Sequence, residues 1–310
     1  MIAILDEATL GTGLDLSIFN KFGDVVRYPT TSVEELHPRL EGIDIVITNK
    51  VEFREQEFEA APRLKLICLT ATGMDNVDLG AAAEYGVVVK NVKGYSTCSV
   101  AQHTFSMLFH LMENNHYYDN YTRDGGWANS HTFTNIDKTF WEVRGKKWGI
   151  IGLGDIGREV AKIAQVFGAD VSYFSPSGNK YDDEIKYYDD LEAFLKENKI
   201  VTIHTPLNNF SRDLIKKEQL ELLQPGAIIL NLARGGIINE ADVAWAVDNL
   251  DIYHGVDALE TEPMTPNHPF LSVKRKDRLF VTPHIAWASI EARTELIKQV
   301  AGNIEAFLGQ

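Results

Sequence analysis

The chain has 310 residues, of which 45% are hydrophobic and 24% charged, and its formal net charge is −14 at pH 7. This length suits two globular domains rather than a single core. Because nucleic acids and anionic membrane surfaces repel a strongly acidic protein, neither is an expected partner. No apolar stretch approaches the roughly 20 residues of a membrane-spanning helix. Met1–Asp6 carry no targeting pattern, and Cys68 and Cys98 are typical of reduced thiols, so we expect a cytoplasmic protein.

Short runs rich in Val and Ile recur along the chain, with helix-like segments between them. Strands that alternate with helices predict parallel sheets, and runs that are apolar at consecutive positions predict strands covered on both faces. The expected fold class is therefore α/β, with two doubly wound parallel-sheet domains of the Rossmann or flavodoxin-like type and a cleft between them. The expected strands lie at residues 2–5, 44–48, 64–70, 86–91, 147–152, 170–174, 200–204, 227–233, 253–258 and 279–283.

The boundary between the two cores is expected near residue 97. One long helical pattern begins at residues 96–99 and continues to Arg123, and an irregular segment rich in Gly, Asn, Thr and Trp follows it up to Lys147. A new series of strands and helices begins after this segment. The last helical pattern, from about Ser289 to Leu308, has no strand after it, so we expect it to pack back on the first domain.

A glycine-rich motif follows the strand-like run at 147–151. Gly152, Gly154 and Gly157 form a G-x-G-x-x-G pattern, and a helical pattern begins directly after it. In this context the first glycine permits a tight turn, the second lets a pyrophosphate approach, and the third lets the helix pack closely on the strand. The helix N-terminus would favour the anion, which explains how so acidic a chain can bind a dinucleotide. A glycine turn without a ligand is the alternative.

Three further side chains follow strand-like runs at positions where open α/β sheets place their ligands. They are Arg234, Glu262 and His284. Taken singly, each could be an ordinary surface cation, turn carboxylate or core histidine. Together they provide an anion clamp, a proton donor and a group that tunes this donor, as hydride transfer at a 2-oxo acid requires. No metal site is expected.

Seven motifs occur in an order that resembles the D-isomer-specific 2-hydroxyacid dehydrogenase family, nearest its glycerate dehydrogenase and hydroxypyruvate reductase branch. The motifs are ATGMDNVDL, NVKGYSTCSVAQHT, GIIGLGDIG, HTPLN, NLARGG, DALETEP and TPHIAWAS. The resemblance covers nearly the whole chain. It implies an NAD(P)-dependent oxidoreductase that transfers a hydride between the nicotinamide and a small D-2-hydroxy acid or 2-oxo acid, such as glycerate and hydroxypyruvate or glyoxylate. It also implies a homodimer formed through the long helix and the segment after it.

The same resemblance implies roles for individual residues. Arg234 would bind the substrate carboxylate, His284 would act as general acid and base, Glu262 would hydrogen-bond this histidine, and Asp257 would lie near the nicotinamide amide. Residues 1–97 plus 287–310 would form the substrate domain, whose backbone around Thr72, Gly73 and Met74 would hold the carboxylate, and residues 98–286 would form the dinucleotide domain. The remaining cofactor contacts would be Thr104, Asp155, Ile156, Thr205, Pro206, Leu232 and Ala233.

Two other activities are open within the same fold. A formate or phosphite dehydrogenase is disfavoured, because formate dehydrogenases of this superfamily have a longer N-terminal part and a Gln at the position of Glu262. A dinucleotide-sensing binding protein, similar to the corepressors of the superfamily, would keep the fold and most of these residues. The extensions of such corepressors are not expected here, since the sequence ends directly after the last helical pattern.

The cofactor preference depends on the residue after the second strand of the dinucleotide domain. NAD-specific sites place an acidic side chain there, which binds the ribose hydroxyls and repels a 2′-phosphate. This chain has Ser175 instead, followed by a turn with hydroxyls, an amide and Lys180. We therefore expect NADP(H) to be slightly favoured over NAD(H). The alternative is that Ser175 contacts the ribose of NAD and Lys180 is merely solvated.

Overall fold

The computed structural model describes residues 1–309 and divides the chain into two compact units. Unit 1 comprises Met1–Ser96 and Ala288–Gln310, and unit 2 comprises Thr97–Trp287. The two units meet between residues 96 and 97 and between residues 287 and 288, next to the positions 97 and 287 expected from the sequence. None of the helices in the described part of the chain is both long and apolar enough to span a membrane.

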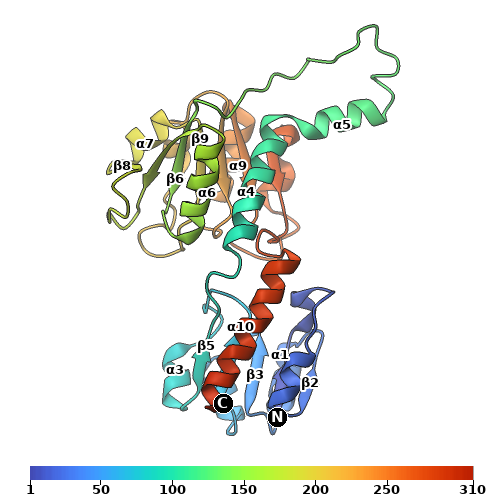
Figure 1. Cartoon of the computed structure of the whole chain (residues 1–310), viewed down its shortest axis with the longest axis vertical. Helices are drawn as coiled ribbons and strands as arrows, with labels where there is room; N and C mark the ends of the chain where they lie inside the picture. Colours follow the sequence, from blue (N-terminus) through green and yellow to red (C-terminus); the bar gives the residue numbers. More distant parts are fainter. Residues whose placement is uncertain (310) are drawn as a thin grey trace. The chain divides into compact units, whose positions relative to one another are not determined.

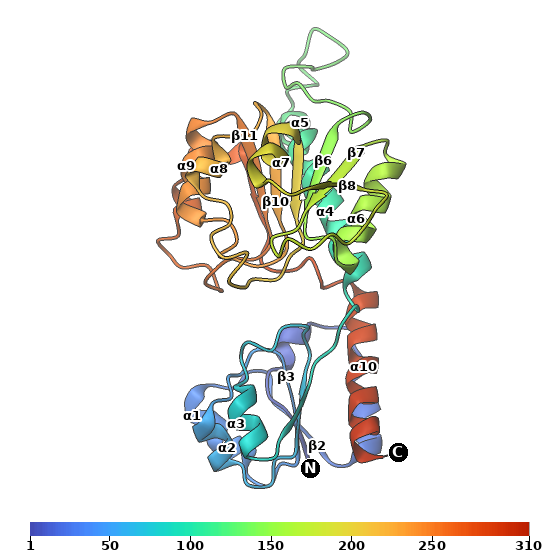
Figure 2. The same ribbon diagram turned by 90° about the vertical axis from the view of Figure 1, so that its left-hand side faces the viewer.

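Unit 1 is a five-stranded parallel sheet with the strand order β2-β1-β3-β4-β5. Helices α1, α2 and α3 pack on one face over a core that includes Val46 and Ile67, and α10 covers the other face (Figure 2). Ser289 caps α10, because its side chain accepts a hydrogen bond from the Ala292 N–H. The elements are β1 Ile2–Ile4, β2 Val25–Arg27, β3 Ile45–Thr48, β4 Leu66–Leu69, β5 Val88–Lys90, α1 Val33–Leu40, α2 Glu55–Ala60, α3 Leu79–Glu84, α10 Ile290–Leu308 and the 3₁₀ turns η1 Glu7–Leu10 and η2 Ser17–Phe22.

Unit 2 is a seven-stranded parallel sheet with the strand order β12-β11-β10-β9-β6-β7-β8. The order reverses between β6 and β9, and in open α/β sheets such a reversal opens a ligand crevice at the carboxyl ends of the strands. The elements are β6 Lys147–Ile151, β7 Asp170–Phe174, β8 Lys186–Tyr188, β9 Ile200–Ile203, β10 Ala227–Asn231, β11 Ile252–Val256, β12 Leu279–Val281, α4 Thr97–Met112, α5 Asn115–Arg123, α6 Asp155–Val166, α7 Leu191–Glu197, α8 Lys217–Leu220, α9 Glu240–Asn249, η3 Pro269–Ser272 and η4 Lys276–Arg278.

Both faces of this sheet are covered by helices, as the apolar strands predicted (Figure 1). Helices α4 and α6 pack on one face against a buried cluster that includes Trp148 and Ile150. Helices α7, α8 and α9 pack on the other face against Ile151 and Ile229. The α/β class with two doubly wound parallel sheets is therefore confirmed.

The prediction of a single long helix from residue 96 to Arg123 is wrong, because the structure has two helices there, α4 and α5. Asn114 lies between them in the left-handed conformation, with φ of 52°, which asparagine tolerates better than most residues. Strands β2 and β8 were also not expected. Each combines a charged residue with only two apolar or aromatic ones, VVR and KYY, so neither forms the longer run rich in Val and Ile that marked the other strands.

Helix α5 and the segment 124–146 extend from the sheet of unit 2 as an arm (Figure 1). Most of this segment forms no regular element, as its composition predicted. Four of its large apolar side chains are strongly exposed: Trp127 by 54%, Phe133 by 90%, Ile136 by 77% and Phe140 by 60%. An arm of this kind leaves apolar surface without a partner in the chain itself.

Candidate functional site

The three glycines after β6 differ in what surrounds them, and each matches a separate role. Gly152 has φ of 92°, and a Cβ there would lie 2.9 Å from the carbonyl oxygen of His204. A Cβ on Gly157 would lie 2.2 Å from the carbonyl oxygen of Gly152, so α6 can pack on β6 only without one. A Cβ on Gly154, by contrast, would meet no atom within 4 Å. This open space at the N-terminus of α6 fits a dinucleotide pyrophosphate.

Two of the expected pyrophosphate contacts lie at this helix start. Asp155 and Ile156 are the first residues of α6, and Gly154 is its N-cap. Asp155 is exposed and Ile156 half-buried. Their backbone N–H groups therefore belong to the first turn, which has no intrahelical acceptor.

The turn after β7 carries hydroxyls, as expected, but its cation is already paired. Ser175 is buried, and its Oγ lies 3.0 Å from the Oγ of Ser177. Lys180 forms an ion pair of 2.6 Å with Asp183. Both partners are largely exposed, so this pair contributes little stability and a competing anion could break it.

The other expected cofactor contacts follow β9 and β10. Thr205 and Leu232 are 8% and 6% exposed, Ala233 is half-buried, and Pro206 is exposed. Thr104 is less accessible than these. Its side chain is fully buried, and its Oγ1 donates to the carbonyl oxygen of Val100 one turn earlier in α4. Its contact with the cofactor stays a prediction.

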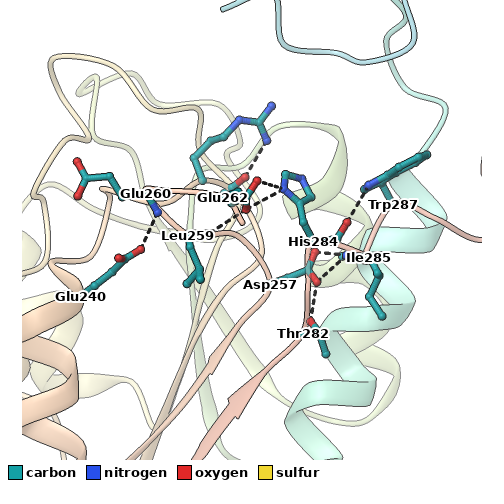
Figure 3. A network of polar contacts seen from close by, with 12 residues as sticks. Glu240, Asp257, Leu259, Glu260, Glu262, Thr282, His284, Ile285 and Trp287 are labelled. Atoms are coloured by element: carbon teal, nitrogen blue, oxygen red, sulfur yellow. Dashed lines mark hydrogen bonds and ion pairs between the residues drawn. The ribbon is translucent and has the colours of Figure 1, made fainter. Parts of the chain in front are cut away.

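His284 and Glu262 form a close pair (Figure 3). The Nδ1 of His284 lies 2.7 Å from Oε2 and 2.9 Å from Oε1 of Glu262. Since a carboxylate only accepts hydrogen bonds, Nδ1 carries the proton and donates it to Glu262. The Nε2 of His284 is then the ring nitrogen left to exchange a proton with a substrate.

His284 lies in a strained backbone conformation, and Asp257 holds the chain around it. The φ of His284 is 56°, which is uncommon for any residue other than glycine. Asp257 is 2% exposed, and its carboxylate accepts hydrogen bonds from the N–H groups of Ile285 at 2.9 Å and Ala286 at 2.8 Å and from the Thr282 hydroxyl at 2.5 Å (Figure 3). Both of its oxygens therefore fix the turn on either side of His284. The expected position of Asp257 near the nicotinamide amide stays a prediction.

His103 on α4 extends this chain of hydrogen bonds and was missed in the sequence. Its Nε2 lies 3.2 Å from the Oγ1 of Thr282. The Thr282 proton is donated to Asp257, so His103 must donate its own Nε2 proton to Thr282. Burial lowers the pKa of His103, and the nearby Asp257 carboxylate opposes this only in part. The motif AQHT contained His103, but nothing in the pattern indicated its distant partner.

Arg234 follows β10, and its Nη1 donates to the carbonyl oxygen of Ala233 at 2.8 Å. The next residue, Gly235, is buried, and a Cβ on it would lie 2.0 Å from both the nitrogen of Glu260 and the carbonyl carbon of Leu259. The Arg234 loop and the turn that carries Glu262 are thus in direct backbone contact. Their spacing depends on the absence of a side chain at residue 235.

Thr72, Gly73 and Met74 follow β4 in unit 1. The hydroxyl of Thr72 donates to the carbonyl oxygen of Val92, and the side-chain amide of Asn91 donates to the carbonyl oxygen of Thr72. These bonds fix the loop. Within residues 1–309, the backbone N–H groups of Thr72, Gly73 and Met74 donate to no acceptor, so they are free to bind an anion.

Comparison with known proteins gives a consistent family. Residues 105–286 match the family model "D-isomer specific 2-hydroxyacid dehydrogenase, NAD binding domain". A putative 2-hydroxyacid dehydrogenase of Haemophilus influenzae is 38% identical over 91% of this chain and 90% of its own length. A glycerate dehydrogenase of Methylorubrum extorquens is 35% identical over 90% of this chain and 87% of its own length.

The fold agrees with solved structures as well. An acyclic imino acid reductase in complex with NADPH and D-Arg superposes with a TM-score of 0.86 at 27% identity, over 100% of this chain and 98% of that one. The family match covers more than half of the chain, and the relatives extend it over nearly all the rest. The chain belongs to the D-isomer specific 2-hydroxyacid dehydrogenase family, whose members act on the CH–OH group of 2-hydroxy acids.

Proposed function

We propose that this protein reduces a small 2-oxo acid to the D-2-hydroxy acid, and catalyses the reverse reaction, with a nicotinamide dinucleotide as the hydride carrier. The observation that carries the proposal is the His284–Glu262 pair, at 2.7 Å, because it leaves one imidazole nitrogen available for proton transfer. Hydroxypyruvate and glyoxylate are the substrates we favour. The similarity to a glycerate dehydrogenase supports the first of them.

Each residue has a distinct part in the proposed reaction. Arg234 binds the substrate carboxylate and polarises the carbonyl, a role that suits its planar guanidinium. The free N–H groups of Thr72, Gly73 and Met74 bind the carboxylate as well. In reduction, imidazolium Nε2 of His284 gives its proton to the carbonyl oxygen; in oxidation, neutral Nε2 takes the proton from the hydroxyl. Glu262 stabilises the imidazolium and keeps the ring oriented.

The open cradle at Gly154 and the start of α6 would hold the pyrophosphate, and Thr205, Pro206, Leu232 and Ala233 would line the rest of the cofactor site. The dinucleotide supplies or accepts the hydride at the substrate carbon. Asp257 would hold the His284 turn and would also lie near the nicotinamide amide.

The direct test is turnover of hydroxypyruvate, glyoxylate and pyruvate with NADH and with NADPH, beside a His284→Asn control. Asparagine tolerates the φ of 56° at this position, so the variant should fold. We expect it to lose activity by about 100-fold or more, the usual contribution of a general acid. A wild-type protein that binds the dinucleotide but turns over none of these acids would favour a dinucleotide-sensing binding protein instead.

For the cofactor, NADPH is proposed to be used at least as well as NADH. The residue directly after β7 is Ser175 rather than a carboxylate, and Ser175, Ser177 and Asn179 present groups able to donate hydrogen bonds to a 2′-phosphate. Ser175→Asp should shift the ratio of kcat/KM values toward NADH, because the new charge repels the phosphate. A strong preference of the unmodified protein for NADH would contradict this proposal.

A cytoplasmic homodimer is proposed, and the arm supports the dimer. The exposed side chains of Trp127, Phe133, Ile136 and Phe140 are apolar groups on the arm that a second copy of the chain could cover. Sedimentation of the wild type should give twice the chain mass of 34.8 kDa, and Phe133→Ser combined with Ile136→Ser should weaken the association. A monomeric wild type at micromolar concentration would rule out a stable dimer.

A further inference from the structure

Beside the turn that carries Glu262 lies a second carboxylate–histidine pair, between Glu240 and His268. Glu240 is the first residue of α9, and His268 immediately precedes η3. The Oε2 of Glu240 lies 2.8 Å from the Nε2 of His268, and the side chains are 15% and 5% exposed. Neither residue has a role in the proposed reaction.

The protonation of this pair follows from its hydrogen bonds. The backbone N–H of Phe270 donates to Nδ1 of His268 at 3.2 Å, so Nδ1 carries no proton. The proton of the neutral ring is then on Nε2, which donates to Glu240. The other oxygen of Glu240 accepts the backbone N–H of Glu260 at 2.7 Å (Figure 3). Both oxygens of Glu240 are therefore acceptors, a combination that a carboxylate provides and an amide does not.

The N–H of Glu260 belongs to the turn that presents Glu262. On one side the Leu259–Glu260 peptide packs against Gly235, where a Cβ would lie 2.0 Å away. Within the turn, the N–H of Leu259 donates to Oε1 of Glu262 at 3.0 Å, and the same carboxylate accepts from His284. An unbroken series of contacts thus runs from His268 through Glu240 and the turn to His284.

From this geometry we propose that Glu240 and His268 are positioning residues, which fix the 259–262 turn so that Glu262 stays aligned with Nδ1 of His284. In this proposal the pair acts through the turn and not directly on the substrate or the cofactor. The inference rests on the proposed function, because it concerns the alignment of the proposed general acid.

The central variant is Glu240→Gln. Whichever way the glutamine amide is turned, its NH₂ group faces another donor, either the Nε2–H of His268 or the N–H of Glu260, so one of the two hydrogen bonds is lost. We expect kcat to fall by about tenfold, a loss typical of misplacement by a fraction of an ångström, while KM for the oxo acid changes little. His268→Asn should act similarly, because its Oδ1 can accept from Phe270 in place of Nδ1, but its NH₂ group is too close to the backbone to reach Glu240 as Nε2 does.

Two comparisons separate positioning from a general loss of stability. Asp242→Asn is the matched control: Asp242 lies in the same first turn of α9, but its Oδ2 accepts from the N–H of Lys217, away from the 259–262 turn. It should keep the wild-type kcat. In a Glu262→Gln background, Glu240→Gln should have almost no further effect on kcat, because its action passes through Glu262.

A measurement that does not depend on activity completes the test. Hydrogen exchange, followed by mass spectrometry, should be faster for the peptide covering residues 258–263 in Glu240→Gln and His268→Asn than in the wild type and Asp242→Asn. A wild type without oxo acid turnover would refute the proposed function, and the exchange rates would then decide whether the pair holds the turn. The inference would be overturned by unchanged hydrogen exchange of this peptide in the two variants or by an unchanged kcat in Glu240→Gln. It would also be overturned if Glu240→Gln lowered kcat in the Glu262→Gln background as much as it does in the wild type.

Discussion

The conformation of His284 depends on a single buried carboxylate. Asp257 receives three donors, two of them the N–H groups of the residues that follow His284. A left-handed residue of this kind persists only where surrounding contacts hold it. The strain at His284 is therefore offset by hydrogen bonds of Asp257, at a site where orientation of the imidazole matters for the proposed chemistry.

We expect Asp257→Asn to impair both stability and turnover. The amide NH₂ would face one of the donor groups, and an unsatisfied buried group costs about 1–3 kcal/mol. Urea unfolding should show this loss, and kcat should fall well beyond what partial unfolding explains. If unfolding and kcat are both unchanged, the carboxylate does not hold the turn.

Glu262→Gln should lower the kcat of oxo acid reduction while KM for the oxo acid changes little. The carboxylate offers two oxygens to the Nδ1–H of His284, whereas a glutamine offers one, and a bond to a neutral acceptor is weaker than a charge-assisted one. Glu260→Gln is the control, because this side chain is on the same turn but is exposed and pairs with Arg212. An unchanged kcat in Glu262→Gln would contradict the pairing.

At the scale of elements, the βα unit of β6 and α6 offers a pair of matched substitutions. In Gly154→Ala the added Cβ would meet no atom within 4 Å, so the fold should be unaffected. The same methyl group would occupy the space proposed for the pyrophosphate. Dinucleotide affinity should fall with no change in melting temperature. Gly157→Ala places its Cβ 2.2 Å from a backbone oxygen, so α6 must move and stability should fall by about 1–3 kcal/mol. Equal effects of the two variants on stability would refute this division of roles.

Strand β11 contains a buried histidine whose protonation makes the stability of the sheet depend on pH. Burial lowers the pKa of His254 to about 4, and burial lowers the pKa of His204, after β9, to about 3. The Nδ1 of His254 lies 3.0 Å from the carbonyl oxygen of Ile229 on the neighbouring strand. The folded protein therefore keeps both rings neutral at a pH where an unfolded chain protonates them.

At the scale of the whole molecule, this predicts acid sensitivity. The unfolded state binds more protons between pH 6.5 and about 4, so the free energy of unfolding falls as the pH falls through this window. Each histidine contributes at most about 1.4 kcal/mol per pH unit. The free energy of unfolding, measured with urea at several pH values from 7 to 5, should fall less steeply with falling pH in His254→Gln than in the wild type. The glutamine retains a donor for Ile229 but does not titrate. The same dependence on pH in both proteins would show that His254 is not responsible.

Much of the architecture could be predicted from the sequence alone, as could the residues proposed to react. Alternation of apolar strands with helices determined the class, because burial on both faces requires it. Gly152, Gly154 and Gly157 act within one strand–turn–helix unit, so short-range spacing was enough to interpret them. Arg234 and His284 could be found for a similar reason, since each lies three residues after a strand of a parallel sheet.

The contacts that hold these groups were decided by the tertiary structure. His103 meets Thr282 across 179 positions, and Glu240 meets His268 across 28. Such contacts depend on which strands and helices become neighbours, and no local pattern encodes that order. The burial of Thr104 had the same origin, since only the packing of α4 determines which of its faces is covered. The sequence by itself thus determined which functional side chains are present, and the tertiary structure decided how they are positioned.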